Sequence, residues 1–147
     1  MADDVTGGNL VRLAAIRDVP LSVDEVVAAV AHPEAGGTAI FIGAVRDHDG
    51  GRDVVGLGYT AHASAEDHLA AVTGRVAASH GALAAAATHR VGELAVGDLA
   101  VVVAVAAAHR AEALTACRAL IDELKATVPI WKHQTFSDGS DEWVGSP

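Results

Sequence analysis

The chain has 147 residues, 51% of them hydrophobic, which is enough for one domain with a single apolar core. Its formal net charge of −9 argues against nucleic acid or an anionic membrane as the main partner. The single cysteine excludes an intramolecular disulfide, and no signal peptide or membrane-spanning apolar stretch is recognisable, so a cytoplasmic setting is expected.

The first elements are predicted from local signals. Residues 1–8 are a polar leader, and residues 10–16 alternate between apolar and polar side chains as a first strand does. Ser22 and Glu25 form a capping box, which predicts a helix that ends at the His-Pro pair at residues 32–33.

The middle of the chain is rich in strands. The apolar run at residues 38–45 predicts a buried strand, and the polar residues 46–52 predict a loop. Residues 54–61 form the next expected strand, in which Gly56 and Gly58 favour a bulge.

The second half begins with a helix expected at residues 64–80. Two further strands are expected at residues 83–91 and 99–107, joined by a turn region at residues 92–98. The clearest helix covers residues 111–127, with an apolar face made of Leu114, Cys117, Leu120, Ile121 and Leu124.

Pro129 stops that helix, and residues 130–136 and 142–144 complete the chain as short strands. Strands and helices interleave, but several consecutive strands lack a helix between them, which favours an α+β sandwich with a mostly antiparallel sheet. Residues 9–147 are therefore expected to form one domain behind the leader.

Only two lysines occur, Lys125 and Lys132, whereas the other eight basic residues are arginines. A primary amine can lose its proton when it is partly buried, which a guanidinium does not do. Two facing ammonium groups lower the pKa of one of them, so a cleft shared by both lysines predicts a nucleophile or a general base. The spacing alone equally suits two surface lysines, with Lys125 favoured by the helix dipole.

Three cations follow predicted strands, where an anion site is often built. His109 and Arg110 join a strand to a helix start, and Arg46 ends a strand before a glycine-rich loop. The segment Asp47-His48-Asp49 raises the alternative of a metal site, but no ligand spacing typical of zinc supports it.

Several motifs resemble those of a known family. They are Phe41-Ile-Gly-Ala-Val-Arg46, Val55-x-Leu57-x-Tyr59, His89-Arg-Val-Gly92, Ala108-His-Arg110 and, most distinctive, Val128-Pro-Ile-Trp-Lys132. Over about residues 9–145 the chain resembles the catalytic subunit of molybdopterin synthase, the MoaE family.

The resemblance implies an α/β hammerhead-type sandwich that forms a homodimer within a heterotetramer. Each subunit would bind a MoaD-type ubiquitin-like sulfur carrier, and the activity implied is a sulfurtransferase of molybdenum cofactor biosynthesis. It moves sulfur from the thiocarboxylated C-terminus of the carrier to cyclic pyranopterin monophosphate (precursor Z), forming the dithiolene of molybdopterin. No cofactor or metal is implied.

The resemblance also implies roles for individual residues. Lys125 would be the main catalytic group and Lys132 its assistant, while the His109-Arg110 pair would come from either subunit of the dimer. The full set of implied substrate-binding residues is Ala44, Val45, Arg46, His109, Arg110, Lys125, Lys132, His133 and Gln134. The chain departs from the family pattern at His133 and Gln134, where a basic residue and a glutamate are usual, so a non-catalytic scaffold that binds the carrier or an anionic pterin is the alternative.

Overall fold

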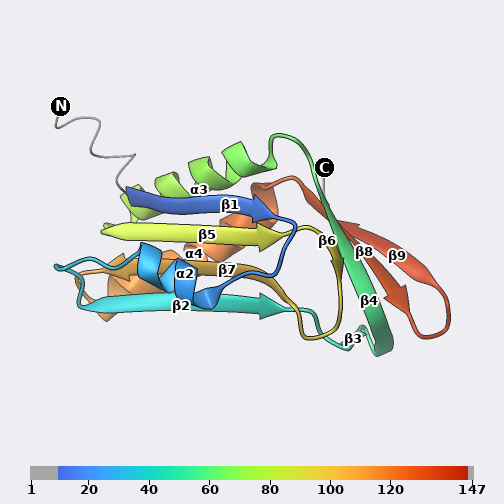
Figure 1. The fold of residues 1–147 in the computed structure, drawn as a ribbon. Coiled ribbons are helices and arrows are strands. Elements are labelled where there is room, and N and C mark those ends of the chain that lie inside the picture. The colour runs from blue at the N-terminus through green and yellow to red at the C-terminus, as the bar shows by residue number, and fades with distance from the viewer. Residues whose placement is uncertain (1–9, 146–147) are drawn as a thin grey trace.

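The computed structural model describes residues 10–145, so the predicted leader at residues 1–8 lies outside the described part of the chain. Within that part, the strands form two sheets that lie side by side, and three helices flank the first of them (Figure 1). The mixed architecture confirms the α+β prediction.

The first sheet has four strands in the order β1 (Val11–Arg17), β5 (Ala84–Arg90), β7 (Leu99–Ala107) and β2 (Gly37–Ala44). Only the β1–β5 pair is parallel, whereas β5–β7 and β7–β2 are antiparallel, as expected for a mostly antiparallel sheet. This order leaves β1 and β2 at the two edges.

Helices cover both faces of this sheet. The helices α3 (Ala65–Ser79) and α4 (Arg110–Thr127) pack on one face, and the short α2 (Val23–Ala29) packs on the other. The four alanines 84–87 of β5 are fully buried between them, alternating between the two faces as strand side chains do. Because alanine ends at Cβ, the helices can approach the middle of the sheet closely.

The second sheet contains β3 (His48–Asp49), β4 (Arg52–Ala61), β8 (Ile130–Phe136) and β9 (Asp141–Gly145) in that order, with β6 (Gly92–Leu94) also paired to β4. A register shift between Val54 and Gly56 confirms the predicted bulge. The strands β3 and β6 lie in segments that were predicted as a loop and a turn, because two or three residues are too short for alternation to be recognised.

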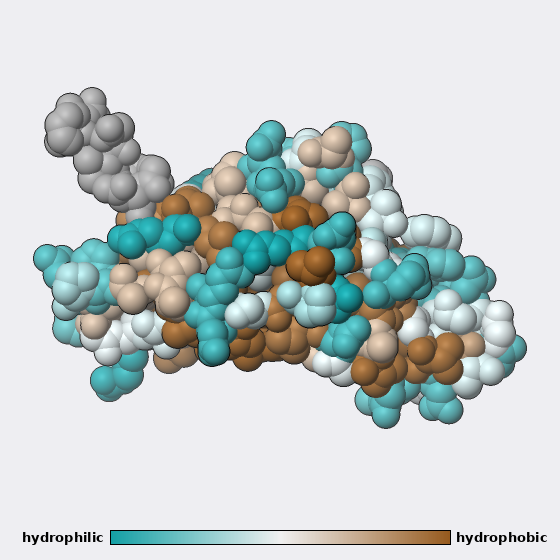
Figure 2. Space-filling view, viewed as in Figure 1, coloured by the Kyte–Doolittle hydropathy of each residue, from teal (hydrophilic) through white to brown (hydrophobic). Residues whose placement is uncertain are grey.

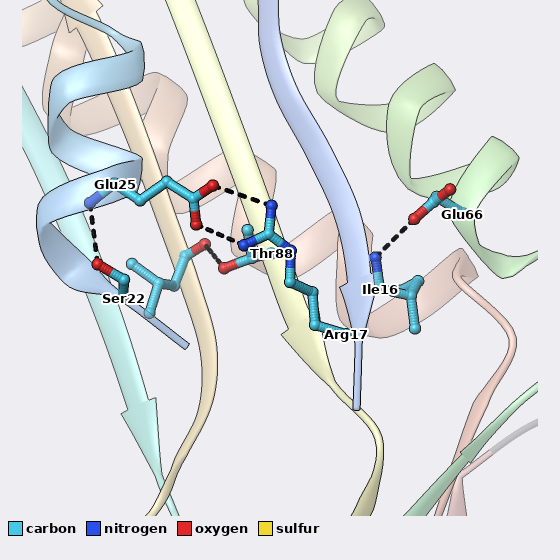
Figure 3. Close-up of polar contacts among 7 residues, drawn as sticks. Ile16, Arg17, Ser22, Glu25, Glu66 and Thr88 are labelled. Carbon is cyan, nitrogen blue, oxygen red and sulfur yellow. Dashed lines mark hydrogen bonds and ion pairs between the residues drawn. The ribbon is translucent and has the colours of Figure 1, made fainter. Parts of the chain in front are cut away.

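Polar contacts fasten α2 to β1 (Figure 3). The Arg17 guanidinium donates to both carboxylate oxygens of Glu25, at 2.5 and 2.9 Å. The Ser22 hydroxyl accepts from the Glu25 backbone N–H at 3.2 Å, which confirms the predicted helix cap. On the outer side of β1, the Glu66 carboxylate accepts from the Ile16 backbone N–H at 2.9 Å.

Two predictions about burial were wrong, and both concern one region. The strand β2 is an edge strand whose Ile40, Phe41 and Ile42 are 38–43% exposed, not a buried strand. Leu114 is 62% exposed because the buried face of α4 is centred on Ala113, Ala116 and Leu120. The side chains of Ile40, Phe41, Ile42, Leu114 and Ile121 form what we call the β2–α4 surface. Figure 2 shows apolar groups along the edge where β2 runs.

Candidate functional site

The two lysines come from different elements that Pro129 separates. Lys125 lies in the last turn of α4, and Val128 closes the helix with a hydrogen bond from its N–H to the Leu124 carbonyl (3.0 Å). Val128 itself is extended, as residues before proline usually are, so the chain turns directly into β8, which carries Lys132. Both lysines line the same two cavities, so the structure places them in one cleft.

One cavity, which we call the apolar cavity, has a volume of about 210 Å³. Besides the two lysines, its lining consists of Tyr59, His89, Leu124, Val128, Ile130, Val144 and Gly145. Four of these are the apolar side chains Leu124, Val128, Ile130 and Val144, so the two lysines, Tyr59 and His89 supply the polar groups of a partly hydrophobic wall.

The other, which we call the cationic cavity, has a volume of about 180 Å³. It shares Tyr59, Lys125 and Lys132 with the apolar cavity and adds Ala44, Val45, Arg46, His48, Leu57 and Gln134. No carboxylate is among these lining residues, whereas arginine, histidine and lysine all are. Such a lining suits an anionic ligand of small size.

The electrostatics of the cleft act most strongly on Lys125. Partial desolvation lowers the pKa of its ammonium, and the positive charge of Lys132 lowers it further, although the side chain as a whole is exposed in the single subunit. The sequence-based expectation that facing ammonium groups lower one lysine pKa agrees with this direction. Lys125 is therefore more easily deprotonated than an ordinary surface lysine.

Gln134 forms the floor of the cationic cavity and is only 3% exposed. Its amide nitrogen donates to Asp49 at 2.7 Å and to Glu142 at 3.1 Å. The hydrogen bond from Gln134 lowers the pKa of Asp49, and the charges of Lys132 and Arg46 lower it further. The neutral amide, where the family usually has glutamate, thus bridges two carboxylates that a third carboxylate would repel.

Arg46 extends from the end of β2 over this cavity. Its guanidinium lies 3.6 Å from Asp49 and is 67% exposed, so it remains accessible to a ligand. Val45 is held by backbone hydrogen bonds to the β6–β7 turn, from its N–H to the Asp98 carbonyl and from the Gly97 N–H to its own carbonyl. These bonds fix the position of the loop that carries Arg46.

The structure does not bring every predicted site residue to the cleft. His109 and Arg110 are exposed at the N-terminus of α4, about 22 Å along the helix from Lys125 at 1.5 Å per residue. His133 points to the opposite face of β8 from Lys132, because strand side chains alternate. There it stacks on Trp143 (ring centroids 4.4 Å apart) and contacts Asp141 at 2.6 Å.

Several lining residues were not among the predicted site residues, and Tyr59 and His89 are two of them. Tyr59, the only tyrosine of the chain, lines both cavities, and burial raises the pKa of its phenol. His89 is the penultimate residue of β5 and lines the apolar cavity together with Lys125; its ring is edge-on to that of Tyr59, with the ring centroids 4.8 Å apart. Both residues occur in motifs that carry the family resemblance, Val55-x-Leu57-x-Tyr59 and His89-Arg-Val-Gly92, but neither was assigned to the site.

The histidines and carboxylates do not gather into a metal-binding group. Among residues 10–145, no three or more histidine, cysteine, aspartate or glutamate side chains come together in a way that could hold a metal ion. Asp47 and His48 contact each other at 2.9 Å, and Asp49 is engaged by Gln134. Nor does that part of the chain contain a helix long and apolar enough to cross a membrane.

Comparisons with known proteins point to one family. The family model described as MoaE protein matches residues 16–127. The chain is 49% identical over 131 residues to "Molybdopterin synthase catalytic subunit 1" of Mycobacterium tuberculosis, covering 88% of each chain. It is 39% identical over 132 residues to the molybdopterin synthase catalytic subunit of Halalkalibacterium halodurans, covering 89% of this chain and 84% of that protein.

Solved structures agree with this assignment. Molybdopterin synthase from Staphylococcus aureus superposes with a TM-score of 0.82 at 30% identity, covering 88% of this chain and 95% of that one. A chain in the complex of subunits 1 and 2 of the molybdopterin-converting factor from Helicobacter pylori superposes with a TM-score of 0.67 at 18% identity. The match covers 92% of this chain and 89% of that one, and it shows a shared fold.

Proposed function

The chain belongs to the MoaE family, and on this basis we propose that it is the catalytic subunit of a molybdopterin synthase. The reaction is a sulfur transfer from the thiocarboxylated C-terminus of a small ubiquitin-like MoaD-type carrier to precursor Z. The product carries the dithiolene of molybdopterin, and the setting is the cytoplasm.

The observation that carries this proposal is the pair of cavities that share Lys125 and Lys132. A sulfur transfer between two substrates needs a centre that both can reach. The cationic cavity suits the cyclic phosphate of the pterin, because its lining includes four basic side chains and no carboxylate. The apolar cavity, bordered by Val144 and Gly145 of β9, suits a narrow peptide tail.

The proposed sulfur transfer gives the lysines a specific role. At each transfer a bond forms between the carrier's sulfur and a pterin carbon, and that carbon loses an oxygen substituent, which leaves as water or remains on the opened phosphate. The acyl–sulfur bond of the carrier then breaks. Water supplies the oxygen with which the carrier leaves as a carboxylate, so two carrier molecules are consumed for one dithiolene. Negative charge develops on the acyl oxygen while water adds, and an ammonium directed at that oxygen stabilises it.

We assign Lys125 to this centre as the proton donor or acceptor and charge stabiliser, because its lowered pKa lets it exchange a proton more readily. Lys132 orients the carrier tail and the pterin from the neighbouring strand. Arg46 and the backbone of Ala44 and Val45 bind the anionic end of the pterin. Gln134 holds the floor of the cavity through Asp49 and Glu142.

His109 and Arg110 fit this site only from a second copy of the chain. An ideal Cβ built on Gly37 would lie 3.3 Å from the Arg110 backbone, so β2 begins beside Arg110, and Ala44 at its other end lines the cationic cavity. The outer edge of β2 has no strand partner among the described residues. Antiparallel pairing of two β2 edges about an axis between Ile40 and Phe41 would set Gly37 of one copy opposite Ala44 of the other.

Such a homodimer would cover the β2–α4 surface and bring the His109-Arg110 pair of each copy toward the cationic cavity of the other. We therefore propose that these two residues act across the dimer, and that carrier subunits complete a heterotetramer.

Reconstitution tests the function directly. The purified protein is mixed with thiocarboxylated carrier and precursor Z, and molybdopterin is measured. We expect product with the native chain and a fall of about a hundredfold or more in Lys125→Ala. Arg75→Ala is the matched control, because it removes an exposed cation of α3 that pairs with Glu123 away from both cavities.

Two outcomes would contradict the proposal. Binding of the carrier without any product would favour the non-catalytic scaffold, and full activity in Lys125→Ala would overturn the assignment of the catalytic lysine. Elemental analysis of the native protein tests the metal-dependent alternative, which requires stoichiometric zinc or manganese.

A further inference from the structure

His89 occupies an unusual position for a histidine. It lies at the end of the central strand β5 and is only 4% exposed, in line with the alanines that face α3 and α4. Its ring forms part of the wall of the apolar cavity, next to Leu124 and Lys125 of α4. A buried polar ring at the end of an alanine-rich strand needs a partner or a function.

The hydrogen bonding of His89 defines its protonation. Nδ1 lies 2.8 Å from the Arg90 backbone carbonyl, and because a carbonyl only accepts, Nδ1 carries the hydrogen. Burial, with a smaller contribution from the charge of Lys125, lowers the pKa of the ring to about 4, so the ring is neutral near pH 7. Nε2 is then a lone-pair acceptor, and the edge-on contact with Tyr59 fixes the plane of the ring.

Two complementary groups therefore share the cavity. Nε2 of His89 has no hydrogen-bond partner among residues 10–145, and the Lys125 ammonium has none there either. The other titratable groups that line this cavity are Tyr59 and Lys132. An ammonium only donates, so Lys132 offers nothing that Lys125 could donate to, whereas Nε2 of His89 and the hydroxyl oxygen of Tyr59 can both accept.

We propose that His89 is a positioning residue whose Nε2 accepts a hydrogen bond from the Lys125 ammonium, directly or through one water, and so directs the amine into the apolar cavity. A cavity of about 210 Å³ has room for such a water. The inference rests on the proposed function in one respect: Lys125 is taken to be the catalytic group. A hydrogen bond to the charged form raises a lysine pKa, so His89 would oppose part of the lowering that desolvation and Lys132 cause.

Two substitutions separate this acceptor from the rest of the ring. His89→Gln places an amide oxygen at about the reach of Nε2, whereas His89→Asn keeps an amide nitrogen near Nδ1 and leaves the cavity without the acceptor. Since the chain has only two lysines, selective ¹³C labelling of lysine gives two side-chain signals, which Lys132→Arg assigns.

We expect the pKa of Lys125 to fall by about one in His89→Asn, a tenfold change in its protonation equilibrium, and to stay near the native value in His89→Gln. The titration of Lys132 should move less than that of Lys125. An unchanged Lys125 titration in His89→Asn, or an equal fall in both variants, would overturn the proposal.

A second measurement needs no substitution of His89, so a folding defect cannot obscure the result. Imidazole ¹⁵N spectra of the native protein at pH 7 should show His89 neutral with hydrogen on Nδ1, and its Nε2 signal should move in Lys125→Met. A ring protonated on Nε2, or an Nε2 signal indifferent to Lys125→Met, contradicts the inference. Neither measurement uses carrier or pterin, so the two proposals can fail separately. A protein that gives both expected spectra but forms no molybdopterin would contradict the proposed synthase function and still support the positioning of Lys125 by His89.

Discussion

Gln134→Glu tests the electrostatics of the site more sharply than any other single substitution. The change keeps the shape of the side chain but replaces the amide nitrogen with an oxygen. The native amide donates to Asp49 at 2.7 Å and to Glu142 at 3.1 Å, so both hydrogen bonds are lost and three carboxylates meet at one point. A chain that gains the residue usual in its family is thus expected to lose stability.

The size of the loss follows from the burial of Gln134. A hydrogen bond to a charged group contributes about 1.5 to 3 kcal/mol, and two are removed at a side chain that is 3% exposed. Two such bonds would contribute about 3 to 6 kcal/mol. Because both partner carboxylates still reach water, we expect less than this sum, a fall of about 2 to 3 kcal/mol in the free energy of unfolding. For a chain of this length the midpoint of thermal unfolding should drop by about 5 to 10 °C.

The effect should depend on pH. Burial and two neighbouring carboxylates raise the folded-state pKa of the new glutamate above its unfolded value of about 4.3. The folded state then binds a proton that the unfolded state has lost, so the destabilisation is full above the raised pKa and shrinks as pH falls toward about 4.3. Urea unfolding of the variant and the native protein, compared at pH 8 and pH 5.5 and at one protein concentration, measures this difference.

Two further variants complete the experiment. Gln134→Met removes the amide without adding charge, so its cost should be nearly the same at pH 8 and pH 5.5, both above the range in which Asp49 titrates. Asp49→Asn combined with Gln134→Glu supplies a new donor opposite the glutamate and should recover much of the loss. If Gln134→Glu costs less than about 0.5 kcal/mol and the cost is the same at both pH values, the arrangement described around Gln134 is wrong.

Three other predictions address the helices, the lysines and the dimer. Ser22→Ala should lower the free energy of unfolding by about 1 kcal/mol, while Ser64→Ala, at a cap without a side-chain hydrogen bond, should cost clearly less in the same urea titration. Lys125→Met should be inactive, but its free energy of unfolding at pH 7 should equal that of the native chain or exceed it by up to about 0.5 kcal/mol. The reason is that the substitution removes a partly desolvated ammonium that Lys132 repels. That advantage should shrink as pH rises through the unfolded-state lysine pKa of about 10.4 and vanish well above it, where the native lysine is neutral in both states. A destabilised variant at pH 7 would contradict the stated cause. Phe41→Lys should convert the dimer to a monomer in sedimentation measurements, whereas Val55→Lys, an exposed valine of β4, should not.

Local signals in the sequence were sufficient for most of the fold. The Ser22 cap and the Pro129 stop are contacts within a few residues, so the ends of α2 and α4 could be predicted well. The burial of β2 could not be predicted, because an apolar edge strand can have the same composition as a strand in the core. The helical period of about 3.6 residues likewise does not show which part of the apolar face of α4 packs against the sheet. Leu114 was therefore predicted to be buried, although it is exposed.

For the site too, the sequence identified some residues and missed the roles of others. Lys125 and Lys132 stood out by composition, and their meeting depends on a chain reversal at one proline. His89 begins one of the family motifs but was not assigned to the site, because its neighbours there, Tyr59 of β4 and Lys125 of α4, are distant in the sequence. In the sequence, Gln134 was interpreted as the loss of a glutamate charge. The structure shows that its amide instead donates hydrogen bonds to Asp49 and Glu142.

The path of β2 has a genetic consequence. One end of this strand lies beside Arg110 and the other opens into the lysine cleft, so under the proposed pairing each centre is assembled from two chains. Two inactive alleles, one encoding Lys125→Ala and one encoding Arg110→Ala, would then complement each other when expressed together. Random mixing makes half of the dimers hybrid, and each hybrid has one intact centre, so about a quarter of all centres would regain activity although every polypeptide in the cell is defective.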